Sequence, residues 1–172
     1  TYPDGTKGGL GAEIFNDLDN NKADGNYAHA EGVDTRASGS GSHAEGYNTR
    51  AVEQGSHAEG YSTSATGNGS HAEGYLVVAG GINSHAEGNE TEAKGNSSHS
   101  EGNKTHALGT ASHAEGSETT AKGAGSHAEG SHTTASGVNS HAEGSGAIAS
   151  GDISHAEGSG TASGHCSHAE GY

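Results

Sequence analysis

The sequence predicts an all-β repeat protein in which fourteen-residue coils stack into a narrow parallel solenoid. Three observations predict it: a Ser-His-Ala-Glu-Gly segment recurs every fourteen residues, each copy alternates small and ionisable residues with period two, and large apolar residues are scarce. Alternation with period two is typical of strands. Strict repetition at one spacing is typical of stacked units that bury their surfaces against one another.

The composition excludes an ordinary globular core. Hydrophobic residues make up 27% of the 172 residues and are mostly Ala, Gly contributes 32 residues, and Met and Trp are missing. Large buried side chains normally offset the entropy lost on folding, so this chain is either disordered or a repeat array. The formal charge of −15 suits disorder, but a disordered tract would not keep one spacing over nine consecutive steps. The order interpretation is therefore favoured.

The first motif fixes the coil length. Its His recurs every fourteen residues from His29 to His155, and the last step, to His168, is thirteen because one residue is missing between Gly158 and Ala162. Ser, Ala and Gly of the motif share one face of the predicted strand, while His and Glu share the other.

A second motif, Thr-x-Ala-x-Gly, lies half a repeat later, as in Thr35–Gly39. Its Thr, Ala and Gly share one face, and variable residues such as Arg36, Arg50 and Val78 occupy the other. Each coil thus has two short strands and an interior of Ser, Ala, Thr and Gly. About eleven coils stacked at about 4.8 Å would give a rod on the order of 50 Å long.

The domain organisation follows from the limits of the repeat. Residues 1–10 are predicted to be a linker or the end of a preceding domain, 11–27 an N-terminal capping coil, and 28–172 the repeat. In the capping coil, Phe15 and Asp17 stand fourteen residues before the first His-x-Glu pair, which places Ile14 in the Ser register. Asn21–Gly25 occupies the register of the second strand. Terminal repeats need such bulkier residues to close the stack.

Several functions are disfavoured. Only seven Lys and Arg are present, scattered along the chain, so nucleic acid is not expected as a partner. The chain has no apolar run near twenty residues, so no direct membrane contact is expected in this segment. Catalysis is not expected either, because His, Glu and Ser recur by periodicity, whereas an active site needs one unique constellation.

The His and Glu of the first motif are the main candidate site, and we call the surface they form the His–Glu face. Its members are His29, Glu31, His43, Glu45, His57, Glu59, His71, Glu73, His85, Glu87, His99, Glu101, His113, Glu115, His127, Glu129, His141, Glu143, His155, Glu157, His168 and Glu170. Stacked carboxylates repel one another unless positive charge neutralises them. A protonated imidazole can do so, and neighbouring Glu are therefore expected to raise the His pKa values toward or above neutrality.

Three interpretations of this face remain open. The first is a hydrated His–Glu network between chains, which would specify register. The second is a divalent or transition metal (zinc, iron or nickel) in some layers, because His-x-Glu places both ligands on one side of a strand; no cofactor is required for folding. The third is a solvent-facing stripe on a single chain.

Tyr47, Tyr61 and Tyr75 follow the Gly of the motif in three consecutive repeats, which predicts a short aromatic stack. Its two interpretations are packing at a turn and a glycan-binding patch, since aromatic rings pack against sugars.

The fourteen-residue unit resembles the head repeat of trimeric autotransporter adhesins. That resemblance implies a left-handed parallel β-roll assembled as a homotrimer. The Ser-His-Ala-Glu-Gly form is similar to repeats in phage and prophage tail-fibre or tail-spike proteins of Gram-positive bacteria, which often precede a self-cleaving C-terminal chaperone domain. The adhesin repeat usually reads Ser-Val-Ala-Ile-Gly, with Val and Ile between protomers, and here His and Glu hold those positions.

The expected function is a non-enzymatic structural or adhesive segment, a rigid trimeric stalk or head of a phage tail fibre or bacterial surface adhesin. Its partners would be two further copies of the chain and a host-cell surface glycan or protein receptor. Its location would be extracellular, on a virion tail or a bacterial surface. The alternatives are a metal- or glycan-binding module and the non-catalytic part of a tail-spike depolymerase.

Overall fold

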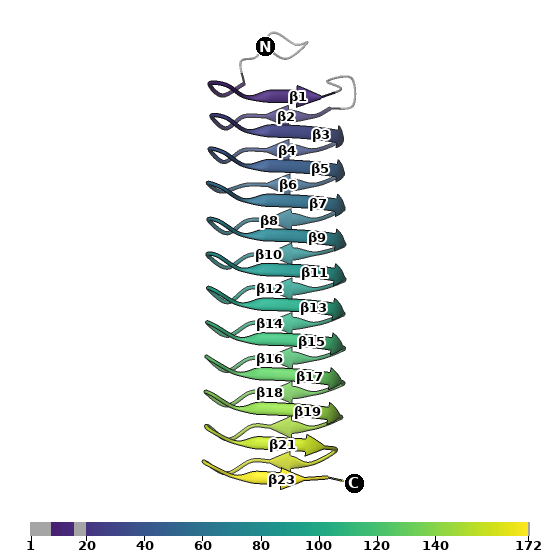
Figure 1. The fold of residues 1–172 in the computed structure, drawn as a ribbon, viewed down its shortest axis with the longest axis vertical. Coiled ribbons are helices and arrows are strands. Elements are labelled where there is room, and N and C mark those ends of the chain that lie inside the picture. The colour runs from purple at the N-terminus through teal and green to yellow at the C-terminus, as the bar shows by residue number, and fades with distance from the viewer. Residues whose placement is uncertain (1–7, 16–19, 172) are drawn as a thin grey trace.

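The chain winds into a straight stack of coils with its two ends at opposite ends of the rod (Figure 1). The computed structural model describes residues 8–15 and 20–171. Within these ranges all regular structure is β-strand, and the strands form two parallel sheets. No helix among the described residues is long and apolar enough to cross a membrane. The predicted all-β parallel solenoid with two strands per coil is confirmed.

One sheet contains the longer strands, each of which, except the first, begins at the His of the first motif. It has 12 strands: β1 (Glu13–Phe15), β3 (His29–Val33), β5 (His43–Tyr47), β7 (His57–Tyr61), β9 (His71–Tyr75), β11 (His85–Asn89), β13 (His99–Asn103), β15 (His113–Ser117), β17 (His127–Ser131), β19 (His141–Ser145), β21 (His155–Gly158) and β23 (His168–Glu170).

The other sheet contains two-residue strands that end at the Ala of the second motif. It has 11 strands: β2 (Lys22–Ala23), β4 (Arg36–Ala37), β6 (Arg50–Ala51), β8 (Ser64–Ala65), β10 (Val78–Ala79), β12 (Glu92–Ala93), β14 (His106–Ala107), β16 (Thr120–Ala121), β18 (Thr134–Ala135), β20 (Ile148–Ala149) and β22 (Thr161–Ala162).

The register places identical motif positions on top of one another. For example, His85 pairs with His99, and Glu87 pairs with Glu101. Neighbouring coils are therefore related by a simple translation, and the stacked His rings lie 4.7–4.9 Å apart, close to the spacing of hydrogen-bonded strands. A uniform rod follows because every coil has the same length and the same register.

Small residues fill the interior as predicted, because the two sheets lie too close for larger side chains. Ala44 and Thr49 are fully buried, and Ser42 is almost so. The Ser hydroxyl donates to the carbonyl oxygen three residues earlier, at 2.7 Å from Ser42 to Gly39. The Thr hydroxyl of the typical coil has no such partner, as at Thr49. One row of the interior is thus satisfied and the other is not.

Glycine is required where one coil crosses the next. Gly46 at the end of its strand has φ +111°, and a Cβ there would overlap the carbonyl oxygen of Gly60 in the following coil. The turns tolerate other residues, because Asn48 and Leu76 adopt the left-handed conformation at φ 53° and 55°. The close approach between coils, rather than turn geometry, therefore accounts for the Gly of Ser-His-Ala-Glu-Gly.

The N-terminal coil has a different register from the predicted one. Glu13 lies opposite His29, Ile14 opposite Ala30 and Phe15 opposite Glu31, so the step to the first repeat is sixteen residues instead of fourteen. The prediction that Ile14 takes the Ser register is wrong, because alternation places this apolar side chain at the inward Ala position. The two additional residues fall between Phe15 and Lys22. Asp17 lies outside the described residues.

The strand pairing elsewhere in the first and last coils agrees with the prediction from the sequence. Lys22 and Ala23 pair with Arg36 and Ala37, as predicted for the second strand. At the far end Gly144 still pairs with Gly158 at fourteen residues. Ile148 pairs with Thr161 at thirteen. The missing residue therefore lies in the turn after Gly158.

Candidate functional site

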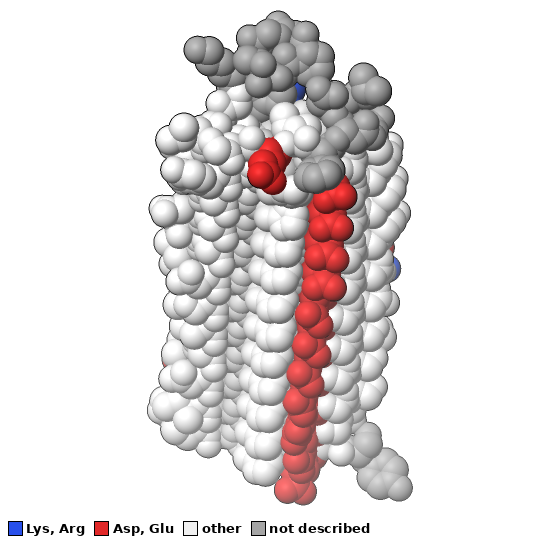
Figure 2. Space-filling model, turned by 45° about the horizontal axis from the view of Figure 1, so that its top comes forward, with Lys and Arg blue, Asp and Glu red and all other residues white. Residues whose placement is uncertain are grey.

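The outer surface of the longer strands carries the His–Glu face. Each of the longer strands from β3 to β23 begins with an outward His and has an outward Glu two residues later, with an inward Ala between them, or Ser100 in β13. Because the register is constant, the His form one column and the Glu form another. Figure 2 shows acidic side chains as a continuous column that runs down the rod beside a column of uncharged side chains. All twenty-two predicted residues of the face are described, and the structure brings them together.

The His side chains form a stack of imidazole rings. From His43 to His168 successive ring planes differ by 2–17°, and only His29 is turned edge-on, at 83° to His43. The stack covers one nitrogen of each ring. The Nε2 atoms that are buried without a hydrogen-bond partner belong to His43, His57, His71, His85, His99, His113, His127, His141 and His155.

All of these nitrogens except that of His141 lie 3.3–3.8 Å from a carboxylate oxygen, which is too long for a short hydrogen bond. The distance from His Nε2 to the Glu Oε2 two residues later is 3.8 Å at His57 and 3.3 Å at His113. Near the C-terminal end the pairing moves between coils, and His155 Nε2 lies 3.4 Å from Glu143 of the preceding coil. The face therefore holds imidazole and carboxylate together without a closed hydrogen-bond network within one chain.

The expectation that Glu raises the His pKa values is wrong for three His that can be assessed. The pKa values of His57, His99 and His127 lie below the ordinary value. Burial is the largest cause, followed by neighbouring imidazoles; nearby Glu act in the opposite direction but are outweighed. A protonated ring in the middle of the stack would face two further rings at 4.7 Å. These His are therefore uncharged near neutral pH, and the face is acidic.

Two carboxylates near the C-terminal end interact directly. Burial and a hydrogen bond with Glu143 raise the pKa of Glu129, and the same hydrogen bond lowers the pKa of Glu143. Both belong to a shallow groove whose other lining residues include Glu115 and Glu157. The carboxylates in this part of the face converge, although they carry like charge.

The residue after the motif Gly changes along the His–Glu face: it is Tyr in three consecutive coils, Asn in the next two and Ser in the three after those. The two Asn coils have His–Glu distances of 3.4 and 3.5 Å. We call the coils with Tyr47, Tyr61 and Tyr75 the tyrosine coils, and those with Ser117, Ser131 and Ser145 the serine coils. The three His–Glu distances in the tyrosine coils are all 3.8 Å. Those in the first two serine coils are 3.3 and 3.5 Å. The Glu side chains are 46–51% exposed in the tyrosine coils and 33–37% exposed in the serine coils.

Groups of ligand atoms close enough to share a metal ion lie only in the C-terminal part of the described face. In each group one atom per residue lies within 4.8 Å of the others. The groups are His113, Glu115, His127; His127, Glu129, His141; Glu143, His155, Glu157; and Glu157, His168, Glu170. The first two offer two imidazoles and one carboxylate. The tyrosine coils have the same residues at the same sequence spacing and form no such group among the described residues.

The predicted aromatic stack is present. The rings of Tyr47, Tyr61 and Tyr75 lie 5.0 and 5.1 Å apart with interplanar angles of 7° and 14°, and all three are exposed. The rings cover one another, and Val33 and Asn89 lie in register beyond Tyr47 and Tyr75, so the ring edges and hydroxyls are the parts that a ligand could reach. Glycan binding at this stack stays a prediction, and such a ligand would have to contact ring edges and hydroxyls.

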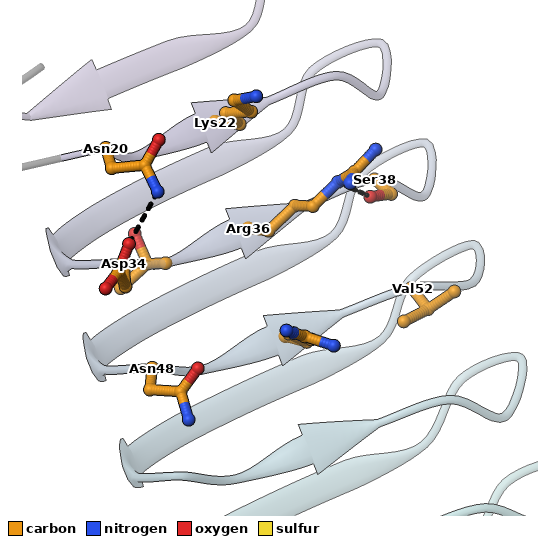
Figure 3. Close-up of a pocket in the computed structure, with 9 residues that line it drawn as sticks. Asn20, Lys22, Asp34, Arg36, Ser38, Asn48 and Val52 are labelled. Atoms are coloured by element: carbon orange, nitrogen blue, oxygen red, sulfur yellow. Dashed lines mark hydrogen bonds between the residues drawn. The ribbon is translucent and has the colours of Figure 1, made fainter.

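The opposite sheet carries a short cationic column that the sequence analysis missed. Lys22, Arg36 and Arg50 lie in register on adjacent strands, so these three cations are not scattered in space. They line a groove near the N-terminal end (Figure 3). Arg36 forms an ion pair with Asp24 at 2.9 Å and donates to Ser38. Their common fourteen-residue spacing was the signal that could have revealed the column.

The chain matches no family model and no curated protein sequence. Its function must therefore be argued from the geometry of its surfaces. The described residues show a parallel solenoid of about eleven turns with a repeat of about fourteen residues. Its most extensive chemical feature is a face that is uniform over the length of the rod.

Proposed function

We propose that this chain is a rigid, non-enzymatic segment of an extracellular fibre or adhesin, in which three copies associate through the His–Glu face. The observation that carries the proposal is the uniformity of this face, since His stacks on His and Glu on Glu from β3 to β23. The outward row of the other sheet instead changes from Arg50 to Val78 to Glu92.

A uniform face of this length implies a partner with the same period. A partner with any other spacing would fall out of register within a few coils, whereas a second copy of the same chain matches every layer. Closed homo-oligomers are the usual result when identical surfaces associate. The resemblance to trimeric adhesin heads and phage fibres supports three copies around one axis, with the left-handed coil of that family.

The interior gives a second reason to expect association. Ala, Ser, Thr and Gly fill each coil, and the largest fully buried side chain is Val77. Little apolar surface is buried per residue, so one chain gains little free energy with which to offset the conformational entropy of folding. Covering the exposed half of each imidazole with a second chain would bury more surface and would give the carboxylates donors from neighbouring rings.

Such a trimer would act as a spacer that presents other parts of a fibre to a host-cell glycan or protein receptor. Its length would be set by the number of coils, and its stiffness by the two continuous sheets. The Lys22–Arg36–Arg50 column lies on the other sheet and remains outside the proposed seam. The Tyr stack borders the seam, because each Tyr lies two residues after the Glu of the same strand.

The test is the mass of the assembled chain together with one steric variant on each sheet. We expect the full chain to be three copies by sedimentation equilibrium and native mass spectrometry. Glu73→Trp places a bulky group on the His–Glu face and should shift the mass toward one copy. Ser64→Trp, on the other sheet, is the matched control and should leave three copies. A parent chain that stays a folded monomer at tens of micromolar would refute the proposal.

A further inference from the structure

We propose that the serine coils hold one Zn²⁺-type transition-metal ion per chain, with His113, Glu115 and His127 as its ligands. The neighbouring set of His127, Glu129 and His141 overlaps it at His127, so only one of the two sets can be filled at a time. The same His-x-Glu pattern occurs in every repeat, but we propose that the ion binds at only one place on the His–Glu face.

The distances fit a tetrahedral ion. Two ligands that are each 2.0–2.1 Å from a tetrahedral zinc lie about 3.3 Å from each other. His113 Nε2 and Glu115 Oε2 are already 3.3 Å apart. The His127 ring stacks 4.7 Å from the His113 ring, and all three ligand atoms lie within 4.8 Å of one another. Binding would require the His127 ring to rotate so that its nitrogen turns toward the ion.

The donor atoms also fit. Two imidazole nitrogens and one carboxylate oxygen form a typical protein environment for zinc, with a fourth position left for water or a group from another molecule. The Nε2 atoms of His113 and His127 are buried and have no hydrogen-bond partner within the chain. A buried polar atom without a partner is costly, and a metal ion would use the lone pair of a neutral ring. His57, the equivalent residue of a tyrosine coil, is buried in the same way.

The convergence of a third ligand atom decides the location, because the coils of Asn89 and Asn103 have His–Glu distances of 3.4 and 3.5 Å but form no three-ligand group among the described residues. In the tyrosine coils His Nε2 and Glu Oε2 are 3.8 Å apart, longer than the ligand spacing of a tetrahedral site. In the serine coils the carboxylate lies closer to the ring and is less exposed. All three ligands come from one chain, so the site does not depend on the association proposed above.

The experiment uses the full chain without a purification tag, stripped with EDTA and then titrated with Zn²⁺ by calorimetry. Co²⁺ is titrated in parallel, because its visible absorption reports four-coordination. We expect one ion per chain and an intense four-coordinate Co²⁺ spectrum. His127→Ala removes a ligand of both overlapping sets and should weaken binding at least tenfold. His57→Ala is the matched control, since it removes a ring from the same stack in a tyrosine coil, and should leave the affinity within about twofold.

Two results would overturn the inference. Equal losses in His127→Ala and His57→Ala would show diffuse binding along a His-rich surface, and the absence of a four-coordinate Co²⁺ spectrum would show that no site forms. Circular dichroism of both variants excludes unfolding as the cause of a loss. Sedimentation in EDTA, read together with the titration, separates this inference from the proposed function: a trimer that binds no ion in the titration rejects only the site, and a monomer that binds one ion rejects only the assembly.

Discussion

The tyrosine coils and the serine coils have the same His and Glu at the same spacing, yet they present different surfaces. In the tyrosine coils the carboxylate lies 3.8 Å from the ring and about half of it is exposed. In the serine coils it lies at 3.3–3.5 Å and is about one-third exposed. The residue after the motif Gly is Tyr in one region and Ser in the other, and the two Asn coils between them have intermediate Glu exposures of 44% and 42%. The geometry of the His–Glu pairs thus varies along the rod while the backbone register stays constant.

The backbone is the property that the two regions share, and glycine substitutions should affect both equally. Gly60 in a tyrosine coil and Gly130 in a serine coil have φ of +112° and +103°, and a Cβ at either would overlap a carbonyl oxygen of the next coil. We expect Gly60→Ala and Gly130→Ala each to destabilise the protein by about 3 kcal/mol or more, because conformational strain adds to a backbone clash. Chemical denaturation followed by circular dichroism measures the effect.

Gly55→Ala is the control for these two substitutions. Gly55 has φ +62° but open space around its Cβ position, so its replacement should cost only about 1 kcal/mol. If Gly60→Ala proves no worse than Gly55→Ala, the coils do not approach as closely as described. A large difference between Gly60→Ala and Gly130→Ala would show that the two regions differ in backbone as well as in surface.

The second expected effect is a loss of stability on mild acidification of metal-free protein. The pKa of His57 is lowered first by burial and then by His71 and His43, while Glu59 and Glu45 act in the opposite direction. The unfolded chain keeps an ordinary His pKa of about 6.5, so on acidification it binds protons before the folded chain does. Stability is therefore complete above about pH 6.5 and falls as the pH drops toward the lowered pKa of the folded state.

Denaturation midpoints in EDTA at about pH 7.5 and about pH 5.5 measure this effect, with pH values chosen on either side of the ordinary His pKa. His57→Gln should show a smaller loss than the parent chain, because one titrating ring has been removed. Stability that instead rises on acidification would mean that the Glu side chains dominate the His environment. That outcome would restore the original expectation of a charged His–Glu network.

The third prediction concerns variants in which Tyr and Ser are exchanged at the position after the motif Gly. Replacing Tyr47, Tyr61 and Tyr75 with Ser should let the neighbouring carboxylates move toward the rings and should create a second Co²⁺ site. The reverse pair, Ser117→Tyr and Ser131→Tyr, should weaken Zn²⁺ binding about tenfold, a typical effect of residues that support metal ligands. The same cobalt and calorimetric titrations measure both. Unchanged stoichiometry and affinity would show that the residue after Gly does not control the carboxylate.

Strict periodicity made most of the fold predictable. Once each His was assigned to one coil, the strand pairs, the inward Ala and the outward Glu followed from alternation alone. The N-terminal coil was misplaced because it no longer repeats, and the position of Ile14 was decided by its burial in the core instead of by the fourteen-residue count.

The electrostatics of the face could not be predicted from the same pattern. The sequence shows that His and Glu alternate, but the His pKa depends on whether the rings stack and cover one another, which requires side-chain positions. The difference between the tyrosine and serine coils likewise depends on fractions of an ångström. The Lys22–Arg36–Arg50 column was readable from spacing, but it was overlooked because the second motif was treated as variable.

The smallest expected effect concerns the interior, where the two regions should again behave alike. The hydroxyls of Thr63 in a tyrosine coil and Thr119 in a serine coil are buried without a hydrogen-bond partner. Val77 already occupies this row and is fully buried. Thr63→Val and Thr119→Val should therefore each raise the free energy of unfolding by about 1 kcal/mol, because an unsatisfied buried hydroxyl is removed at nearly constant volume.

At Thr105 the same replacement is expected to change the free energy of unfolding in the opposite direction. In its coil Ser100 replaces the usual Ala, and the two hydroxyls form a hydrogen bond at 2.8 Å. Thr105→Val should lower the free energy of unfolding by about 1 kcal/mol, since it leaves the Ser100 hydroxyl buried alone. Denaturation of the three variants under one set of conditions measures these differences. If Thr105→Val were as stabilising as Thr119→Val, the Ser100–Thr105 bond would contribute nothing. The row of Thr hydroxyls would then be satisfied in some other way in every coil.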